Sequence, residues 1–510
     1  MIKKFKLYII LIAMAVSSAS CLDKMPEDGI PFDKSLQTVS DINLAVIGIY
    51  DAFRSNYLYS GNLTLLPDIQ TDLVYGVNGN TNIYGDIWRW KEIKPTNTDI
   101  EAVYGALYDV INRCNFMLDR ADAVRKKTTD DKDLDKLDQC CGEAYFARAL
   151  AYSELVKLFC KAYESDEDAA GQLGVILSEH YLGDETMRRA SLKDSYQFIL
   201  DDLDRAAELL ELEEDFDTDT QGTLYDSIYF NEYTVHALRA RVLLYMKRWD
   251  EAIKYATKVI DSGYYYLSSC TRAATSNASY YKYMWTNDFS TEAIWKVGFT
   301  VNAYGGALGQ VFANYDYSTL RPDYVPATWA INLYDMNDLR VSAFFQSFTT
   351  GYSHGLTWPL LIKYFGNESF TNYNILHVSM PKVLRLSEQY LIRAEAYVQR
   401  DQPDYGKAGS DISVLRTARY SSYGGSTSLN KENAMDVIEQ ERVKELYMEG
   451  FRLHDLKRWH KGFERTPQDQ SLSNGSSLKV EKDDPLFVWP IPQHELDAPG
   501  SEVEPNESNK

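Results

Sequence analysis

The sequence predicts a mainly α-helical protein: a tetratricopeptide-like scaffold of helical hairpins, interrupted by a large, irregular insert that is rich in loops and aromatic residues. Three observations predict this fold. Apolar residues recur at helical spacing through residues 36–263 and again after residue 381. Two of these helices follow one another with only a short break. Between residues 264 and 380 the periodicity fades, and glycine, asparagine, serine and aromatic residues become frequent.

The clearest helical pair spans Asn231 to Ile260. Its first helix carries one apolar stripe at i, i+4, i+7 and i+11, formed by Leu238, Val242, Tyr245 and Trp249. After a break at 248–250, a second amphipathic helix ends at Ser262-Gly263, since glycine favours the C-terminal end of a helix. Small residues allow the two helices to pack closely, as in a tetratricopeptide hairpin: Ala237, Ala240, Ala252 and Ala256.

Other segments share this helical spacing, and we expect each to form a helix: 36–53, 100–123, 143–159, 191–210 and 386–397. Their separations are uneven, so they do not predict a regular solenoid. An aromatic loop, 68–90, interrupts the scaffold of residues 36–263, and residues 264–380 form the expected ligand-binding subdomain. Residues 497–510 form a polar tail that we expect to fray.

The N-terminus has the organisation of a lipoprotein signal. Lys3, Lys4 and Lys6 precede an apolar run over residues 7–16, which is too short to span a bilayer and is typical of a removable leader. Ser18-Ala19-Ser20 supplies small residues for cleavage directly before Cys21, although Ser18 replaces the more usual leucine. We expect residues 1–20 to be removed, Cys21 to carry the lipid, and 21–35 to form a tether. A plain secretory signal with an incidental cysteine is the alternative.

Composition narrows the classes of partner. The chain has 74 acidic and 53 basic residues, for a net charge of −21. This balance argues against nucleic-acid binding and against electrostatic adhesion to anionic lipid, so we expect membrane contact through the lipid anchor only. The cysteines beyond Cys21 are Cys114, Cys140, Cys141, Cys160 and Cys270. Their spacing indicates neither a dense disulfide framework nor a metal-binding motif, and we expect several of them to be buried free thiols.

Three C-terminal segments, supported by weaker matches at 108–115 and 148–152, carry a family resemblance: PKVLRLSEQYLIRAEAY at 381–397, ERVKELYMEGFRLHDLKRW at 441–459, and LFVWPIPQHEL at 486–496. They resemble the signature segments of the RagB/SusD outer-membrane nutrient-binding lipoproteins. The resemblance implies a helical, tetratricopeptide-containing protein displayed at the bacterial surface. It also implies that the protein covers a TonB-dependent, SusC-like outer-membrane transporter and delivers oligosaccharide to it, although some members handle peptides.

The residues of these motifs indicate a structural role. Glutamates one turn apart lie among arginines, an arrangement typical of salt-bridged helix faces: Glu441, Glu445 and Glu449 with Arg442, Arg452 and Arg458. Gly450 allows a close approach or a bend. Prolines in Trp489-Pro-Ile-Pro492 set rigid angles and are expected to end a strand. We therefore interpret 381–496 as signature helices and a closing strand that hold the fold.

The two aromatic loops supply the groups that bind sugars, because flat rings cover the apolar face of a sugar while amides and carboxylates meet its hydroxyls. A stacked ring contributes about 0.5–1.5 kcal/mol beyond burial. Polar, glycine-rich surroundings favour exposed rings, but any single one of them is more often packed in a core, so the cluster is better supported than its members. The candidate glycan-binding residues are Asp72, Asn78, Tyr84 and Trp88 in the first loop and Tyr283, Trp285, Asn302 and Tyr304 in the second.

Catalysis and metal binding are less well supported. The sequence lacks GxSxG, HExxH and P-loop patterns, and its histidines are scattered, so we expect no enzyme activity and no cofactor. Residues 215–226 resemble a calcium loop, but Thr220 occupies the position that needs glycine, which favours an acidic linker; the ligands would be Asp215, Asp217, Asp219 and Asp226.

The leading hypothesis is a non-catalytic oligosaccharide-binding lipoprotein, anchored in the outer membrane and facing the cell exterior. Two alternatives stay open. One is a peptide-binding or other nutrient-binding member of the same family, and the other is a helical scaffold that binds only protein.

Overall fold

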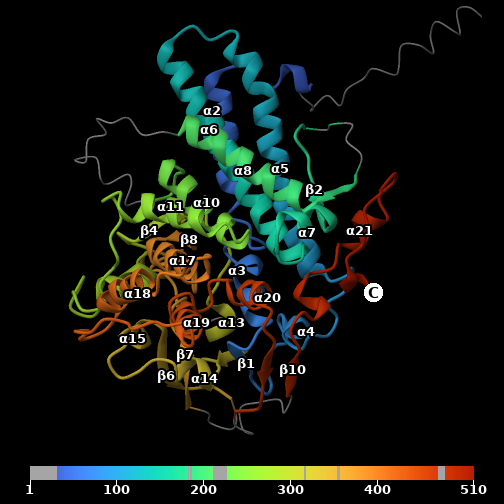
Figure 1. Cartoon of the computed structure of the whole chain (residues 1–510). Helices are drawn as coiled ribbons and strands as arrows, with labels where there is room; N and C mark the ends of the chain where they lie inside the picture. The colour runs from blue at the N-terminus through green and yellow to red at the C-terminus, as the bar shows by residue number, and fades with distance from the viewer. Residues whose placement is uncertain are drawn as a thin grey trace, which may run out of the picture.

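The computed structural model describes residues 31–181, 183, 187–210, 227–314, 318–352, 357–468 and 477–510. The expected lipid site at Cys21 and the expected calcium ligands Asp215, Asp217, Asp219 and Asp226 lie outside these residues. The longest helices gather in the upper half of Figure 1, and the lower half combines further helices with most of the short strands. No helix of the described part is both long enough and apolar enough to cross a membrane.

The upper half is a helical scaffold. Two long helices, α5 (Thr98–Arg125) and α6 (Asp131–Phe159), pack against each other and against α2 (Val39–Ala52), while α6 also packs against α8 (Leu192–Leu209). Polar side chains fix where these helices begin, because each accepts hydrogen bonds from unpaired backbone N–H groups of the first turn. The capping residues are Thr38 for α2, Asn97 for α5, Asp130 for α6 and Ser191 for α8.

The predicted hairpin is confirmed as α10 (Glu232–Tyr245) and α11 (Trp249–Ile260), which pack together. Asn231 caps the first helix with its side chain, and Gly263 follows the second at φ 75°. The stack continues in space from α11 to α17 (Leu386–Gln399), then to α18 (Tyr405–Arg419) and to α19 (Ala434–Glu445). Helices distant in sequence therefore share one tetratricopeptide-like layer.

The loop-rich half carries short helices of its own: α12 (Tyr280–Thr286), α13 (Gln310–Ala313), α14 (Thr328–Ile331), α15 (Arg340–Phe344) and α16 (Glu368–Thr371). In the described part, strands pair antiparallel in two-stranded sheets: β1 (Val74–Gly76) with β5 (Tyr324–Pro326), β2 (Leu173–Ile176) with β3 (Arg189–Ser191), β4 (Ala293–Lys296) with β8 (Lys382–Arg385), β6 (Phe345–Thr349) with β7 (Thr357–Leu361), and β9 (Phe463–Arg465) with β10 (Leu478–Val480). The β1–β5 pair joins the first aromatic loop to the second.

Smaller elements complete the described chain: η1 (Phe32–Lys34), α3 (Asn62–Ile69), α4 (Gly85–Trp88), α7 (Asp166–Gly171), α20 (Arg452–Arg458), η3 (Pro485–Phe487), α21 (Gln493–Leu496) and η4 (Glu507–Asn509). One apolar core fills the helical scaffold and a second lies under the loops. The cysteines of the described part are free and buried, as expected.

The second signature segment does not form one continuous helix. The helix α19 ends at Glu445, and the chain reverses through Met448 at φ 59° and Gly450 at φ 83° before α20 begins. A Cβ atom at Gly450 would lie 3.1 Å from the carbonyl oxygen of Thr64. Both roles expected of this glycine, a bend and a close approach, are therefore present.

The expected closing strand is wrong. Residues 488–492 belong to no strand, because their polar groups bond to helical segments instead. The backbone N–H of Trp489 donates to the carbonyl oxygen of Leu158 at the end of α6 (2.9 Å), and its indole N–H donates to Gln70 (2.9 Å). The segment thus closes the fold by donating hydrogen bonds to a carbonyl group at a helix end and to a side-chain amide, rather than by pairing with a strand.

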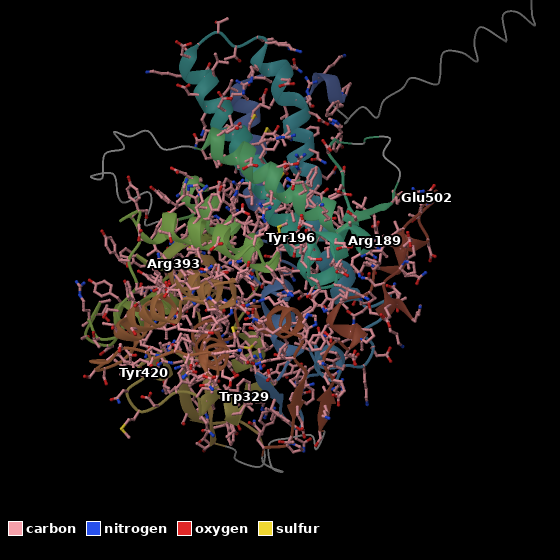
Figure 2. The ribbon with its side chains drawn as sticks, in the orientation of Figure 1. Arg189, Tyr196, Trp329, Arg393, Tyr420 and Glu502 are labelled. Atoms are coloured by element: carbon pink, nitrogen blue, oxygen red, sulfur yellow. The ribbon has the colours of Figure 1, made fainter. Side chains whose placement is uncertain are left out.

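The expectation that the C-terminal tail frays is also wrong. The buried side chain of Asn506 donates to the carbonyl oxygens of Phe159 (2.9 Å) and Trp489 (2.8 Å). Arg189 donates to the carbonyl oxygen of Glu504 at 3.0 Å, and Figure 2 places Arg189 beside the tail that carries Glu502. These hydrogen bonds hold the tail against the rest of the protein, although its composition is polar.

The signature glutamates lie in a buried ion network. Glu445 contacts Arg340 (3.0 Å), Arg385 (3.0 Å) and Arg419 (2.9 Å), which come from α15, β8 and α18. Glu441 contacts Arg340 at 2.7 Å. The guanidinium groups outweigh burial and hold the pKa of Glu441 at about 2. The motif is therefore structural, as interpreted, but its glutamates pair with distant arginines rather than with those inside the motif.

Candidate functional site

The two tryptophans of the predicted site, Trp88 and Trp285, are buried, so both are core residues, which is the alternative that the sequence favoured for any single ring. The guanidinium of Arg465 lies over Trp88, 4.4 Å from the ring centroid. The Nζ of Lys363 lies 4.0 Å from the ring centroid of Trp285. Because an aromatic face attracts a cation, these rings help to accommodate buried charge inside the protein.

Two further residues of the first loop hold the fold. The carboxylate of Asp72 accepts hydrogen bonds from Arg452 at 3.0 and 2.9 Å. Trp329, in the lower part of the molecule in Figure 2, donates its indole N–H to the Asp72 carbonyl oxygen at 2.7 Å. The half-buried Tyr84 donates its hydroxyl proton to the Asn62 side chain at 2.9 Å. The polar groups of Asp72 and Tyr84 are thus engaged within the protein.

Tyr283 and Tyr304 both lie near the short helix α16. Tyr283, half-buried on α12, faces a hollow whose opposite wall includes Glu368 and Thr371. Tyr304 is 46% exposed, and its ring centroid lies 6.4 Å from that of Phe370 on α16. Both rings remain candidates for ligand contact.

The first hollow is the space between α12 and the segment that begins α16, with a volume of about 590 Å³. Its walls combine two ring side chains with amide, hydroxyl and a few charged groups. The lining includes Asn277, Lys282, Tyr283, Thr286 and Asn287 on one side and Phe365, Glu368 and Thr371 on the other. Cavities of this size with a few polar groups hold small ligands.

One buried carboxylate anchors both walls of the first hollow. Asp288, directly after the wall residue Asn287, accepts a hydrogen bond from the Asn367 amide at 2.6 Å and pairs with the ammonium of Lys382. The same Asn367 side chain accepts from the Ser369 N–H at 2.9 Å and so caps α16. Asp288 therefore sets the separation between the end of α12 and the start of α16.

The second hollow lies beyond Phe365, which lines both, and also has a volume of about 590 Å³. It is lined by Ser318, Thr319, Leu320, Phe348, Thr349, Thr350, Gly351 and Phe365. The rings of Phe348 and Phe365 are 5.7 Å apart at their centroids. We call the two hollows together the Phe365 groove.

The first aromatic loop approaches the second hollow. A Cβ atom at Gly79 would lie 3.8 Å from the ring of Tyr352, which follows Gly351 directly. Asp323 holds the turn in place, accepting a hydrogen bond from the Thr81 hydroxyl at 2.8 Å. Burial raises the pKa of Asp323, and the bonds from Thr81 oppose the rise. Asn78 and Asn302 are both exposed, and neither is among the described residues that line the two hollows.

The structure thus places Tyr283 in the groove and leaves Asp72, Tyr84, Trp88 and Trp285 as structural residues. Sequence reasoning missed Phe348, Thr350, Phe365 and Asp288. The run Tyr364-Phe365-Gly366-Asn367 was a usable signal, because an aromatic pair followed by turn residues is typical of a surface loop that presents a ring.

Comparisons with known proteins agree with this fold. Residues 346–504 match the model described as the SusD family, and residues 25–225 match the model described as starch-binding associating with outer membrane. The chain belongs to the SusD/RagB family. The resemblance of its C-terminal segments is confirmed.

Individual relatives are distant. The chain is 24% identical to SusD-like protein P2 of Formosa agariphila over 162 residues, which is 31% of this chain and 30% of that relative. A SusD superfamily protein from Bacteroides thetaiotaomicron superposes with a TM-score of 0.75 at 23% identity, covering 92% of this chain and 99% of the other. A putative sugar binding protein from Bacteroides vulgatus gives a TM-score of 0.75 at 23% identity, covering 93% and 100%. The fold is shared over almost the full chain.

This SusD/RagB family member has another cavity, of about 290 Å³, between the end of α6 and the C-terminal segment. His460 lies at its edge, with Nδ1 2.6 Å from Asp483 and Nε2 2.8 Å from Glu164, which also pairs with Lys247. Partial burial lowers the pKa of His460, but its bonds to Asp483 and Glu164 outweigh burial and raise the pKa above the usual value. Both ring nitrogens can donate only when the ring is protonated.

We expect this His460 contact to stabilise the protein in acid. Because the folded pKa is raised, the contribution is fully present below the unfolded pKa of about 6.5 and is lost as pH rises through the folded pKa. His460→Gln should therefore lower the free energy of unfolding at pH of about 5.5 and change it little at about 8.5. Urea unfolding at both values measures this difference, and an equal loss at both would contradict the role of protonation.

Proposed function

We propose that this protein binds oligosaccharide in the Phe365 groove, without catalysis, at the surface of the outer membrane. The observation that carries the proposal is the chemistry of the groove walls. The rings of Tyr283 and Phe365 adjoin amide and hydroxyl side chains, among them Asn277, Asn287 and Thr349. This combination covers the apolar face of a sugar and meets its hydroxyls, whereas charged groups are few.

The comparisons support the same proposal. One family model is described as starch-binding and as associating with outer membrane, and a structural neighbour is described as a putative sugar binding protein. We propose that the lipid on Cys21 anchors the chain to the outer membrane, facing outward, and that a TonB-dependent, SusC-like transporter receives the bound glycan. Coexpression with a transporter from the same locus, followed by purification of the complex, tests this partnership.

Binding is tested with the soluble chain on affinity gels that contain single polysaccharides, followed by calorimetry with oligosaccharides of the retarding polymer. Retardation by at least one polysaccharide supports the proposal. Binding to peptides and to no glycan would move the assignment to the peptide-binding alternative. Release of reducing ends from the polymer would contradict the proposed absence of catalysis.

Truncating the rings identifies the site. We expect Tyr283→Ala and Phe365→Ala each to weaken glycan binding about tenfold, because each removes a stacking surface and its buried area. The matched control is Tyr229→Ala, since Tyr229 is 59% exposed and packs against Tyr50 of α2 rather than the groove. Calorimetry measures the three affinities. Equal affinities in all three variants would place the ligand elsewhere.

A further inference from the structure

The exposed face of helix α2 differs from those of its neighbours. In α6 and α8 every exposed residue is polar, as expected of helices that pack on one side and meet water on the other. The exposed residues of α2 are Ser40, Leu44, Ile47 and Asp51. The two central ones are aliphatic, and Leu44 is 62% exposed while Ile47 is 50% exposed. Adjacent exposed apolar side chains of this kind mark a surface that contacts a partner.

An apolar groove of about 820 Å³ adjoins these two side chains and lies between α2 and α5. Its apolar lining residues are Leu36, Leu44, Ala45, Phe116 and Tyr181. The ring of Phe32, which is 39% exposed, stacks on Tyr181 with 5.5 Å between the centroids. The apolar surface thus extends from Phe32, beside the start of the described chain, to Ile47. We call Phe32, Leu44, Ile47 and this groove the α2 face.

The charged groups of the α2 face are mostly engaged within the protein. Asp41 accepts hydrogen bonds from two backbone N–H groups at the start of α2, each at 2.9 Å. Asp109 pairs with Arg113 at 2.8 Å. The exposed Lys34 forms no ion pair with another described residue. A face of this kind suits a lipid surface, because its apolar side chains meet acyl chains while the ammonium of Lys34 meets a lipid phosphate.

The sequence holds the α2 face close to the expected lipid anchor. Cys21 and Pro31 are ten positions apart, and an extended chain spans about 3.3–3.6 Å per residue, so Pro31 lies within about 36 Å of the anchor. This tether gives the face a high effective concentration beside the bilayer, so even a weak apolar contact forms. We infer that the α2 face rests on the lipid bilayer and inserts Phe32, Leu44 and Ile47 at the level of the head groups. The inference rests on the proposed anchoring through Cys21 and adds a second, non-covalent contact, which orients the scaffold.

The net charge of −21 does not oppose this contact. It disfavours electrostatic adhesion to anionic lipid, whereas apolar side chains gain free energy in a neutral bilayer by leaving water. The expectation that the lipid is the only membrane contact considered charge alone. Docking through apolar area should persist at high salt, since salt screens only the interactions between charges.

Fluorescent labels on the lipidated chain in phosphatidylcholine vesicles test the contact. Leu44→Cys carries the label on the α2 face, and Val414→Cys, at a position 45% exposed on α18, is the matched control. The native cysteines of the described part are buried, so the label should react at the introduced thiol. Nitroxide-bearing lipids quench only at close range. They should reduce the fluorescence at position 44 about twofold or more and leave that at position 414 unchanged.

Removing the aliphatic side chains measures their contribution. In the mature chain with Cys21→Ser, which has no lipid, the double variant Leu44→Ser with Ile47→Ser should bind phosphatidylcholine vesicles about tenfold more weakly in flotation at high salt. Val414→Ser is the control and should bind unchanged. Figure 1 shows α2 in the upper half and the strands β6 and β7, which contribute to the second hollow, in the lower half. Glycan affinity and unfolding free energy should therefore stay the same in these variants.

Quenching at position 44 only, with weaker flotation of the double variant, supports the inference. Equal quenching at both positions, or at neither, overturns it and leaves the proposed glycan binding intact. Vesicle binding that salt abolishes overturns the apolar contact. Protection of position 44 only after coexpression with the transporter overturns the bilayer as the occupant and makes the α2 face a protein interface. Absence of lipid on Cys21, measured by mass spectrometry, overturns both the anchoring and the inference.

Discussion

Replacing Glu445 by glutamine is expected to lower the free energy of unfolding by about 3–5 kcal/mol, the usual effect of breaking a buried ion pair. Glu445 is fully buried and contacts Arg340, Arg385 and Arg419. An amide keeps the size of the side chain but removes the charge that these guanidinium groups share. Urea unfolding followed by circular dichroism measures the change.

An exposed pair is the control for Glu445. Asp109→Asn breaks the contact with Arg113, in which both side chains are about half exposed, and should cost about 0.5 kcal/mol or less. A similarly small loss in Glu445→Gln would show that the network is not required for stability. Acid should act like the substitution, because the arginines outweigh burial and depress the folded pKa of Glu445. Its contribution is present above the unfolded pKa and is lost as pH falls through the folded value.

Replacing Asp288 by alanine is expected to affect both stability and ligand binding. It leaves the buried Lys382 ammonium without its carboxylate and the Asn367 amide without its acceptor, which should cost about 3–5 kcal/mol in unfolding free energy. Because Asp288 holds the two walls of the first hollow together, glycan affinity should also fall by about tenfold or more. Unfolding and calorimetry on the same preparation measure both effects.

A second buried pair separates the positioning of the walls from loss of stability. Asp202 pairs with Arg148 at 2.7 Å in the helical scaffold, where both side chains are buried. Asp202→Ala should lose similar stability but keep its glycan affinity. The double variant Asp288→Asn with Asn367→Asp exchanges amide and carboxylate and should recover part of the affinity. Equal affinities in Asp288→Ala and Asp202→Ala would show that Asp288 does not position the groove.

The helices were predictable because their determinants are local. Apolar residues at a spacing near 3.6 mark the buried faces of α5, α6 and α8, and side chains such as Asn231 cap their own helices. The hairpin of α10 and α11 follows from small residues and a C-terminal glycine that lie within thirty residues of each other. The family motifs added the assignment of the C-terminal helices, which composition alone did not supply.

The groove was only partly predictable because its walls come from distant segments. Tyr283 was expected from its polar surroundings, but Phe365 acquires its role from the packing of α16 against the end of α12. Trp285 has the same kind of neighbours in sequence as Tyr283, yet Lys363 covers it from across the fold. Local composition does not distinguish these rings, since burial is decided by contacts that no sequence window contains.

The first aromatic loop depends on the end of the chain for its order. Asp72 bonds to Arg452 across 380 positions, Leu73 accepts from Tyr447 across 374, and Gln70 meets Trp489 across 419. A polypeptide synthesised from its N-terminus cannot make these bonds until nearly all of it has emerged. The long helices can form early, whereas the bonds that hold Gln70, Asp72 and Leu73 wait for the last portion. Nascent chains that stop short of the final motif would therefore carry an organised helical half without a finished binding surface.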